Sequence, residues 1–222
     1  MKAKIRNIAK SKNISAQAVL QNYLMNHFLY RLSLTECKDN FILKGGILIS
    51  SIIGIEHRST MDIDVTLNNF PLQKKLICQA FDKACSVSTN DGISFIFKTI
   101  NPIRDDDIYG GYRILFSAAY GKINAPMSID ISTGDVISPS PQKHSFNDLF
   151  DDNFTFEMWS YPIETILAEK TETVLSRGID NTRLRDFYDI YVLSHNNYDY
   201  GEFQKALVAT SKHRGSYENI SD

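Results

Sequence analysis

Residues 43–67 read LKGGILISSIIGIEHRSTMDIDVTL, and this stretch decides the fold. In its first part a short apolar segment meets Gly45-Gly46 and continues into an apolar helix. Its last part, MDIDVTL, is short, β-branched and alternating, which predicts a strand. Because side chains alternate along a strand, Asp62 and Asp64 share one face and the apolar residues between and after them point to the other.

Two acids on one strand face repel each other, and a divalent cation between them removes that cost. Carboxylate oxygens at this spacing suit Mg²⁺ or Mn²⁺. A third acid, Asp130, stands in the similar setting SIDI at 128–131. If its strand neighbours the first, Asp62, Asp64 and Asp130 converge on one or two metal ions, with Asp130 as the base that activates a hydroxyl.

The glycine pair adds a second feature to this site. Gly45 and Gly46 allow the backbone to approach a phosphate, and the following helix N-terminus offers free N–H groups. Taken singly, a Gly-Gly pair is more often a plain turn, and two acids in D-x-D are more often exposed. The order GG, DID and then IDI favours a site for metal and phosphate.

The remaining patterns predict an α+β fold, in which a helix precedes a mixed sheet and a helical part follows. Ser15 or Asn13 is expected to cap the first helix, and Gly178 to end another. The expected helices span 16–32, 72–86, 161–178, 182–196 and 202–214, and the expected strands 93–100, 112–120 and 126–133. Residues 103–112 form an acid-rich turn and 134–152 a connection. We expect two domains, 1–156 and 157–222.

Composition excludes several classes of protein. The 24 Lys+Arg and 26 Asp+Glu give a net charge of −2, whereas proteins that coat nucleic acid are usually far more basic. Three cysteines without a CxxC pair argue against a disulfide framework and a zinc cluster. No apolar run approaches a membrane span. We therefore expect a cytoplasmic protein without membrane contact.

The order GG, D-h-D and h-D-h, where h is apolar, resembles the nucleotidyltransferase superfamily that includes polymerase beta. The stretch 43–67 further resembles the KGGTAL…R-x-S-x-DIDF segment of the AbiEii/AbiGii toxin family, with Ile47 where a Thr is common. YGGYRI, SIDISTGDVISP and the segment 161–193 resemble that family in the same order. The resemblance covers residues 40–195.

This resemblance implies a polymerase-beta-like sheet domain in a toxin of bacterial toxin–antitoxin and abortive phage infection systems. The implied activity is metal-dependent transfer from a nucleoside triphosphate, either GTP or a pyrimidine nucleotide. Because MenT-type relatives add nucleotides to tRNA 3′ ends, an RNA acceptor, tRNA first, is expected. A cognate antitoxin is implied, which need not bind the toxin directly. Family members often carry further helices, so the helical domain here is expected to be a shortened form.

The helical part supplies further candidates. Lys170 falls on the apolar stripe of its predicted helix, where a lysine is costly unless it has a partner. It either snorkels to solvent or faces the triphosphate, and the family motif AEK-x₆-R, which ends at Arg177, favours the second. Treating Lys170 as an isolated charge, we expect Lys170→Met to leave thermal stability unchanged or slightly raised. In RDFYD, Asp186 is expected to orient Lys170 or a substrate hydroxyl.

Other readings of these residues stay open. The acids of RDFYD could instead form a structural ion-pair network, for example between Arg185 and Asp189. Arg58 and Thr60, just before the DID strand, are expected to contact phosphates. The five histidines show no ligand spacing and are expected at the surface.

Two alternative functions remain beside the nucleotidyl-transferring toxin. One is a module that binds GTP without turnover, which the presence of all three acids and Lys170 disfavours. The other is a nucleotidyltransferase that modifies a small molecule, which fits the downstream motifs less well.

Overall fold

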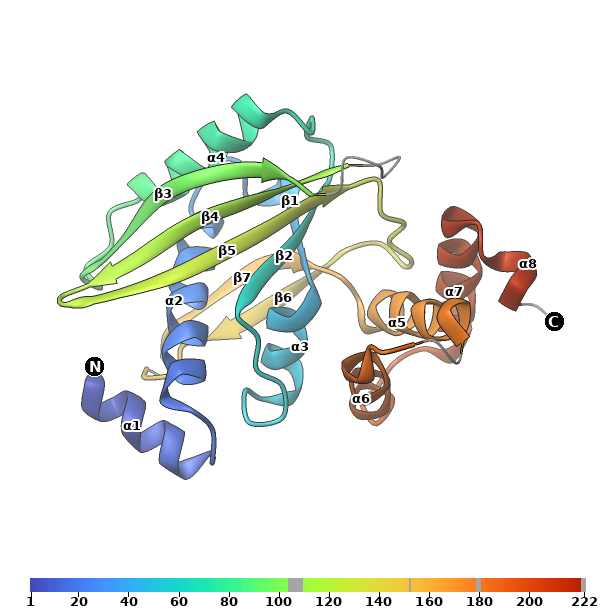
Figure 1. Cartoon of the computed structure of the whole chain (residues 1–222), viewed down its shortest axis with the longest axis horizontal. Helices are drawn as coiled ribbons and strands as arrows, with labels where there is room; N and C mark the ends of the chain where they lie inside the picture. Colours follow the sequence, from blue (N-terminus) through green and yellow to red (C-terminus); the bar gives the residue numbers. More distant parts are fainter. Residues whose placement is uncertain (104–109, 152, 179–180, 221–222) are drawn as a thin grey trace. The chain divides into compact units, whose positions relative to one another are not determined.

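The computed structural model describes residues 1–103, 110–151, 153–178 and 181–220 (Figure 1). They form two compact units. The sheet unit comprises Met1–Gly134 and Lys143–Trp159, and the helical unit comprises Asp135–Gln142 and Ser160–Asp222. The acid-rich turn expected at 103–112 falls mostly outside the described residues. Within those residues, no helix has both the length and the apolar character that a membrane span requires.

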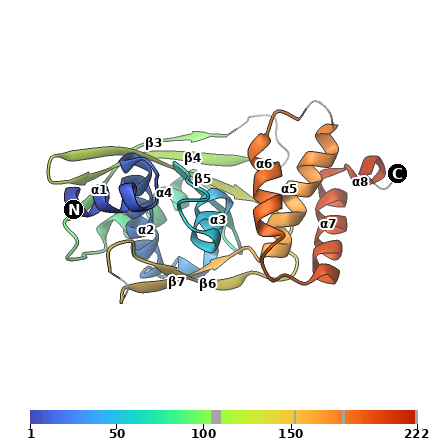
Figure 2. The same cartoon turned by 90° about the horizontal axis from the view of Figure 1, so that it is seen from below.

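A mixed seven-stranded sheet forms the sheet unit, with the strand order β3-β4-β5-β2-β1-β7-β6. The strands are β1 (Phe41–Lys44), β2 (Asp62–Leu67), β3 (Ile93–Pro102), β4 (Gly111–Tyr120), β5 (Ile123–Thr133), β6 (Gln142–Asn147) and β7 (Thr155–Ser160). The helices of this unit are α1 (Lys2–Ser11), α2 (Ala16–Ser33), α3 (Gly45–Ile53) and α4 (Lys74–Ser86). In Figure 2, β3, β4 and β5 run along one side of α2 and α3, and β6 and β7 along the other, so the sheet curves around these helices.

Helix α2 lies inside this curved sheet and is buried almost all round, as expected for a helix enclosed by other elements. The hydroxyl of Ser15 accepts a hydrogen bond from the Ala18 N–H at 3.0 Å, which confirms the expected cap. Phe28 of α2 packs on Phe116 of β4 with ring centroids 5.0 Å apart. Such aromatic contacts fix α2 against the sheet.

The sequence patterns missed several elements of the sheet unit. Helix α1 was not expected, and β6 lies within the stretch expected to be a connection. Strand β6 ends the sheet, and of its polar sequence QKHSFN only Phe146 is buried, so it lacks the alternation that marks a half-buried strand. Strand β7 does alternate, with Phe156 and Met158 buried. The domain boundary expected between 156 and 157 falls inside β7.

The helical unit contains α5 (Ile163–Arg177), α6 (Leu184–Leu193), α7 (Tyr200–Arg214) and the four-residue α8 (Tyr217–Ile220). Gly178 follows α5 with φ +52°, so the expected end of this helix is confirmed. Asp199 caps α7 by accepting a hydrogen bond from the Glu202 N–H at 3.0 Å. Helix α8 was not expected from the polar sequence.

Candidate functional site

Three aspartates lie on one face of two neighbouring strands. Strand β2 pairs with β5 in parallel, in a register that sets Asp64 directly opposite Asp130. Directly opposed residues share a face, and so do residues two apart on one strand. The carboxylates of Asp62, Asp64 and Asp130 therefore project from the same side, while Ile63 and Ile129 are buried on the other. The expectation that the strand of Asp130 lies beside that of Asp62 is confirmed.

Helix α3 begins at the glycine pair, directly against these carboxylates. Gly45 has φ +68°, and a Cβ added there would overlap the Asp64 carboxylate. A Cβ added to Gly46 would lie 2.7 Å from Thr60 Oγ1, and the Gly46 N–H donates a hydrogen bond to Asp64. Glycine at both positions lets the helix N-terminus, with its positive end of the helix dipole, approach the acidic face.

The environment of Asp64 disfavours its negative charge. Burial raises the pKa of its carboxyl to about 6, and the neighbouring charges of Asp62 and Asp130 act in the same direction. Lys44 and the Gly46 N–H oppose the rise without cancelling it. The surroundings thus disfavour the ionised form of Asp64, and a bound cation would relieve this.

Polar and basic residues surround the acids. Thr60, for which contact with phosphates is expected, donates its hydroxyl to Asp62 Oδ1 at 2.7 Å and so orients that carboxylate. Arg58 donates from Nη1 to the Ser59 carbonyl at 2.6 Å. Lys44 of β1 stands directly opposite Asp64 of β2 in the antiparallel register of the two strands. Sequence reasoning did not single out Lys44, although it directly precedes the glycine pair in the quoted motif.

Arg113 is a second residue that sequence reasoning missed. It stands on β4 directly opposite Asp130, and its guanidinium donates from Nε to Oδ1 at 2.6 Å and from Nη2 to Oδ2 at 2.5 Å. These hydrogen bonds and the charge of Asp130 raise the pKa of Arg113. The sequence YRI contains this arginine but not the register that brings it to Asp130.

Among the described residues, no three His, Cys, Asp or Glu side chains are arranged as a ready metal site. The chemistry of the acidic face nevertheless fits a hard divalent cation. It offers carboxylate oxygens on one side of two strands, and burial raises the free energy of the Asp64 charge. Asp62, Asp64 and Asp130 are the residues that would hold Mg²⁺ or Mn²⁺.

In the helical unit, Lys170 of α5 lies between two aspartates of α6. Its Nζ lies 2.8 Å from Asp186 Oδ1 and 2.7 Å from Asp189 Oδ2. The Asp189 side chain is fully buried, and that of Lys170 is 16% exposed. The view of Lys170 as an isolated charge is therefore wrong, since a cross-helix contact supplies its partners. The expected contact between Asp186 and Lys170 is present. Arg185, the alternative partner expected for Asp189, is exposed.

The AEK motif takes part in another ion-pair group of this unit. Arg214 of α7 lies 2.5 Å from Glu172 Oε2 and 3.2 Å from Glu169 Oε1, both on α5. Arg177 is exposed at the last residue of α5. The three aspartates thus belong to the sheet unit, and the Lys170 group belongs to the helical unit.

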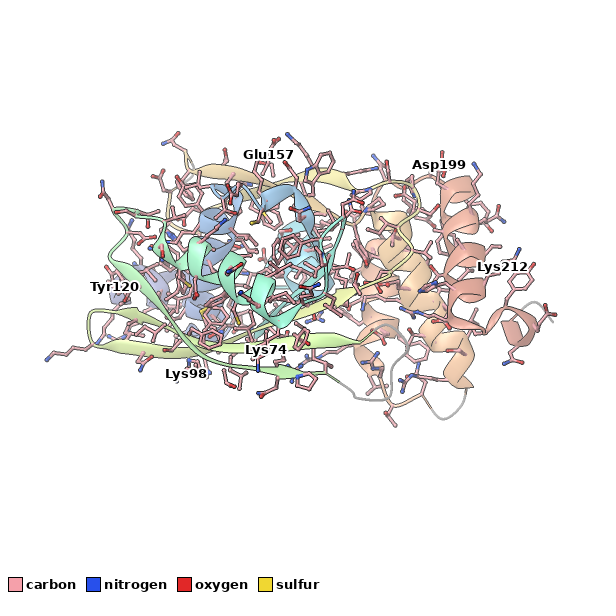
Figure 3. The ribbon with its side chains drawn as sticks, turned by 90° about the horizontal axis from the view of Figure 1, so that it is seen from above. Lys74, Lys98, Tyr120, Glu157, Asp199 and Lys212 are labelled. Carbon is pink, nitrogen blue, oxygen red and sulfur yellow. The ribbon has the colours of Figure 1, made fainter. Side chains whose placement is uncertain are left out.

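A pocket of about 610 Å³ lies elsewhere in the sheet unit, lined by residues that include Tyr23, His27 and Tyr120. His27 is buried, and its ring nitrogens lie 2.8 Å from Asp91 Oδ2 and 3.1 Å from Asp148 Oδ2. The expected surface position is thus wrong for His27. Tyr120, labelled in Figure 3, ends β4. Arg113 lies seven residues earlier on that strand, a spacing of about 23 Å, so this pocket is separate from the acidic face.

Comparisons with known proteins place these features in a family. Residues 27–222 match the model of a family described as nucleotidyl transferase AbiEii toxin, type IV TA system. No curated protein matches the chain. Among solved structures, JHP933 from Helicobacter pylori is similar with a TM-score of 0.51 and 20% identity, over 93% of this chain and 79% of that one. A putative nucleotidyltransferase from H. pylori is similar with a TM-score of 0.51 and 19% identity, over 90% and 83% of the two chains. At these identities the two structures show the fold, which is nucleotidyltransferase-like.

Proposed function

The chain belongs to the family of AbiEii nucleotidyl transferase toxins of type IV toxin–antitoxin systems, and from this premise we propose that it transfers a nucleotidyl group to RNA. The donor is a nucleoside triphosphate, either GTP or a pyrimidine nucleotide. The acceptor is an RNA 3′ end, and tRNA is the first candidate. The reaction depends on Mg²⁺ or Mn²⁺ and takes place in the cytoplasm.

One observation carries the proposal: Asp64 and Asp130 lie directly opposite each other on β2 and β5, with the first turn of α3 against Asp64. Two-metal nucleotidyl transfer requires carboxylates at such a point, together with donors for the phosphates of the substrate. Asp62, held by the Thr60 hydroxyl, completes the set of three acids.

Each residue then has a part in the reaction. The Gly45 N–H and the side chain of Arg58 bind triphosphate oxygens. Gly46, whose N–H donates to Asp64, lets the backbone approach the bound phosphates. Asp130 accepts the proton of the acceptor hydroxyl. The hydroxyl oxygen forms a bond to the α-phosphorus, the bond from that phosphorus to the β-phosphate oxygen breaks, and pyrophosphate leaves. A bound divalent cation supplies Lewis acidity toward the phosphate oxygens.

Lys170 is proposed to supply positive charge to the triphosphate, with Asp186 as its positioning residue and Arg177 as a further phosphate contact. The support is the family motif together with the ion pairs of Lys170 at 2.8 and 2.7 Å. The two carboxylates hold the Lys170 ammonium in position.

The test is to incubate the purified chain with each of the four α-³²P-labelled triphosphates, Mg²⁺ and total RNA. We expect label on RNA with wild type and none with Asp64→Ala. Asp82→Ala, which removes an exposed acid of α4, serves as the matched control and retains transfer. Binding of a triphosphate without labelled RNA would contradict the proposal and favour a binding module. Label on a small molecule alone would contradict the RNA acceptor.

A further inference from the structure

Arg113 and Asp130 form a bidentate ion pair on the acidic face. Both oxygens of the Asp130 carboxylate accept hydrogen bonds from the guanidinium, at 2.6 and 2.5 Å. A guanidinium placed in this way takes one in-plane lone pair of each oxygen. While the pair is intact, a metal ion can use only the remaining lone pairs of Asp130, and it must bind beside a positive charge.

The pair is placed so that it can open. The side chain of Arg113 is 48% exposed and that of Asp130 is 21% exposed, so water can solvate both groups when the pair opens. Within the described residues, Asp130 is the hydrogen-bonding partner of the Arg113 side chain. Release from Asp130 thus breaks no other hydrogen bond or ion pair of the Arg113 side chain in that part of the chain.

The charges around the pair make exchange with a cation favourable. Arg113 is attracted by Asp130 first, and also by Asp62 and Asp64. A divalent cation bound by the three acids places two positive charges beside their carboxylates, where Arg113 supplies only one. The guanidinium is then repelled from the metal, and its donors fit the oxygens of a triphosphate bidentately.

We propose that Arg113 holds Asp130 while the nucleotide site is empty, and moves to the triphosphate when a divalent cation takes its place. The proposal rests on the function proposed above and adds a phosphate-binding residue to it. Asp130, its partner, is the acid assigned to the acceptor hydroxyl. The exchange therefore withholds this base until a divalent cation displaces Arg113.

The exchange predicts effects of opposite sign on two binding constants. In Arg113→Gln, we expect Mn²⁺ alone to bind roughly three- to tenfold more tightly. The substitution removes both the group that competes for Asp130 and a nearby positive charge. We expect the Mn²⁺ complexes of non-hydrolysable α,β-methylene triphosphates to bind about tenfold more weakly, because a phosphate contact is lost. Arg113→Lys keeps the charge without the bidentate geometry. Both of its binding constants should lie between those of wild type and Arg113→Gln.

Electron paramagnetic resonance of Mn²⁺ measures the first constant, and calorimetry with each of the four analogues measures the second. Arg6→Gln, which removes an exposed arginine of α1, is the control and should change neither. Circular dichroism checks that each variant is folded. A merely structural ion pair predicts that Arg113→Gln leaves Mn²⁺ affinity unchanged or lowers it.

Unchanged or lower Mn²⁺ affinity in Arg113→Gln, or unchanged affinity for the analogues, would overturn this inference and leave the proposed transfer standing. Failure of wild type to label RNA, with both shifts present, would overturn the proposed transfer alone. If wild type does not bind Mn²⁺ at all, both are overturned.

Discussion

The ammonium of Lys170 lies 2.7 Å from the carboxylate of Asp189, a side chain with no exposed surface. This contact ties α5 to α6, and it changes what a substitution of the lysine does. A buried carboxylate that loses a cationic neighbour keeps its cost of desolvation with less compensating attraction.

We expect Lys170→Met to lower the free energy of unfolding by about 2–4 kcal/mol, because the buried Asp189 carboxylate loses the ammonium that lies against it. Replacing both residues, as Lys170→Met with Asp189→Asn, should restore most of the loss. Urea unfolding measures these differences. Lys205→Met, which removes an exposed ion pair with Glu202, is the control and should have little effect. Equal stability of Lys170→Met and wild type would show that the pair contributes nothing to the fold.

Asp64→Asn should separate stability from activity. Burial and two neighbouring acids raise the pKa of Asp64 to about 6, so its ionised form costs free energy in the folded protein at pH 7. We expect the amide to raise the free energy of unfolding by about 1–2 kcal/mol, or a few degrees in Tm, and to abolish RNA labelling. Thermal unfolding and the labelling assay test both parts. Asp82→Asn should change neither, and a lower Tm in Asp64→Asn would contradict the electrostatic argument.

Two glycines with similar backbone angles provide a matched pair. Gly45 has φ +68° and Gly121 has φ +56°, so alanine costs about 1 kcal/mol of backbone strain at either position. A Cβ at Gly45 overlaps the Asp64 carboxylate, whereas nothing lies within 4 Å of a Cβ at Gly121. We therefore expect Gly45→Ala to lower the rate of transfer at least a hundredfold and Gly121→Ala to leave it near wild type. Single-turnover labelling compares the two rates. Equal rates would show that the glycine pair takes no part in transfer.

The buried group around His27 should make stability depend on acid pH. Burial raises the pKa of Asp148, but hydrogen bonds from His27 and the Phe150 N–H outweigh it, so the pKa lies below its usual value. A depressed pKa stabilises the fold above the unfolded-state value near 4 and loses that contribution as pH falls further. Asp148→Asn should thus lower Tm at pH 6–7, and the difference from wild type should shrink toward pH 3. Thermal unfolding at several pH values measures it, and a difference that grows toward pH 3 would contradict this sign.

The sequence by itself determined the local elements of the site. The alternation of MDIDVTL placed Asp62 and Asp64 on one strand face, and Ser15, the cap of α2, was one of the two residues expected there. The glycine pair marked the start of α3, and the order of GG, DID and IDI pointed to the fold and the family. These features depend on the period of a helix or strand and on the backbone freedom of glycine, which neighbours in sequence decide.

Only the tertiary structure decided the partners of these residues. The pairing of Arg113 with Asp130 depends on the register between β4 and β5, and that of Lys170 with Asp189 on the packing of α5 against α6. The edge strand β6 was likewise missed, because its polar sequence becomes a strand only beside β7. Alternation assigns a residue to a face but not to a neighbour, because register and helix packing are set by residues distant in sequence that meet when the core forms.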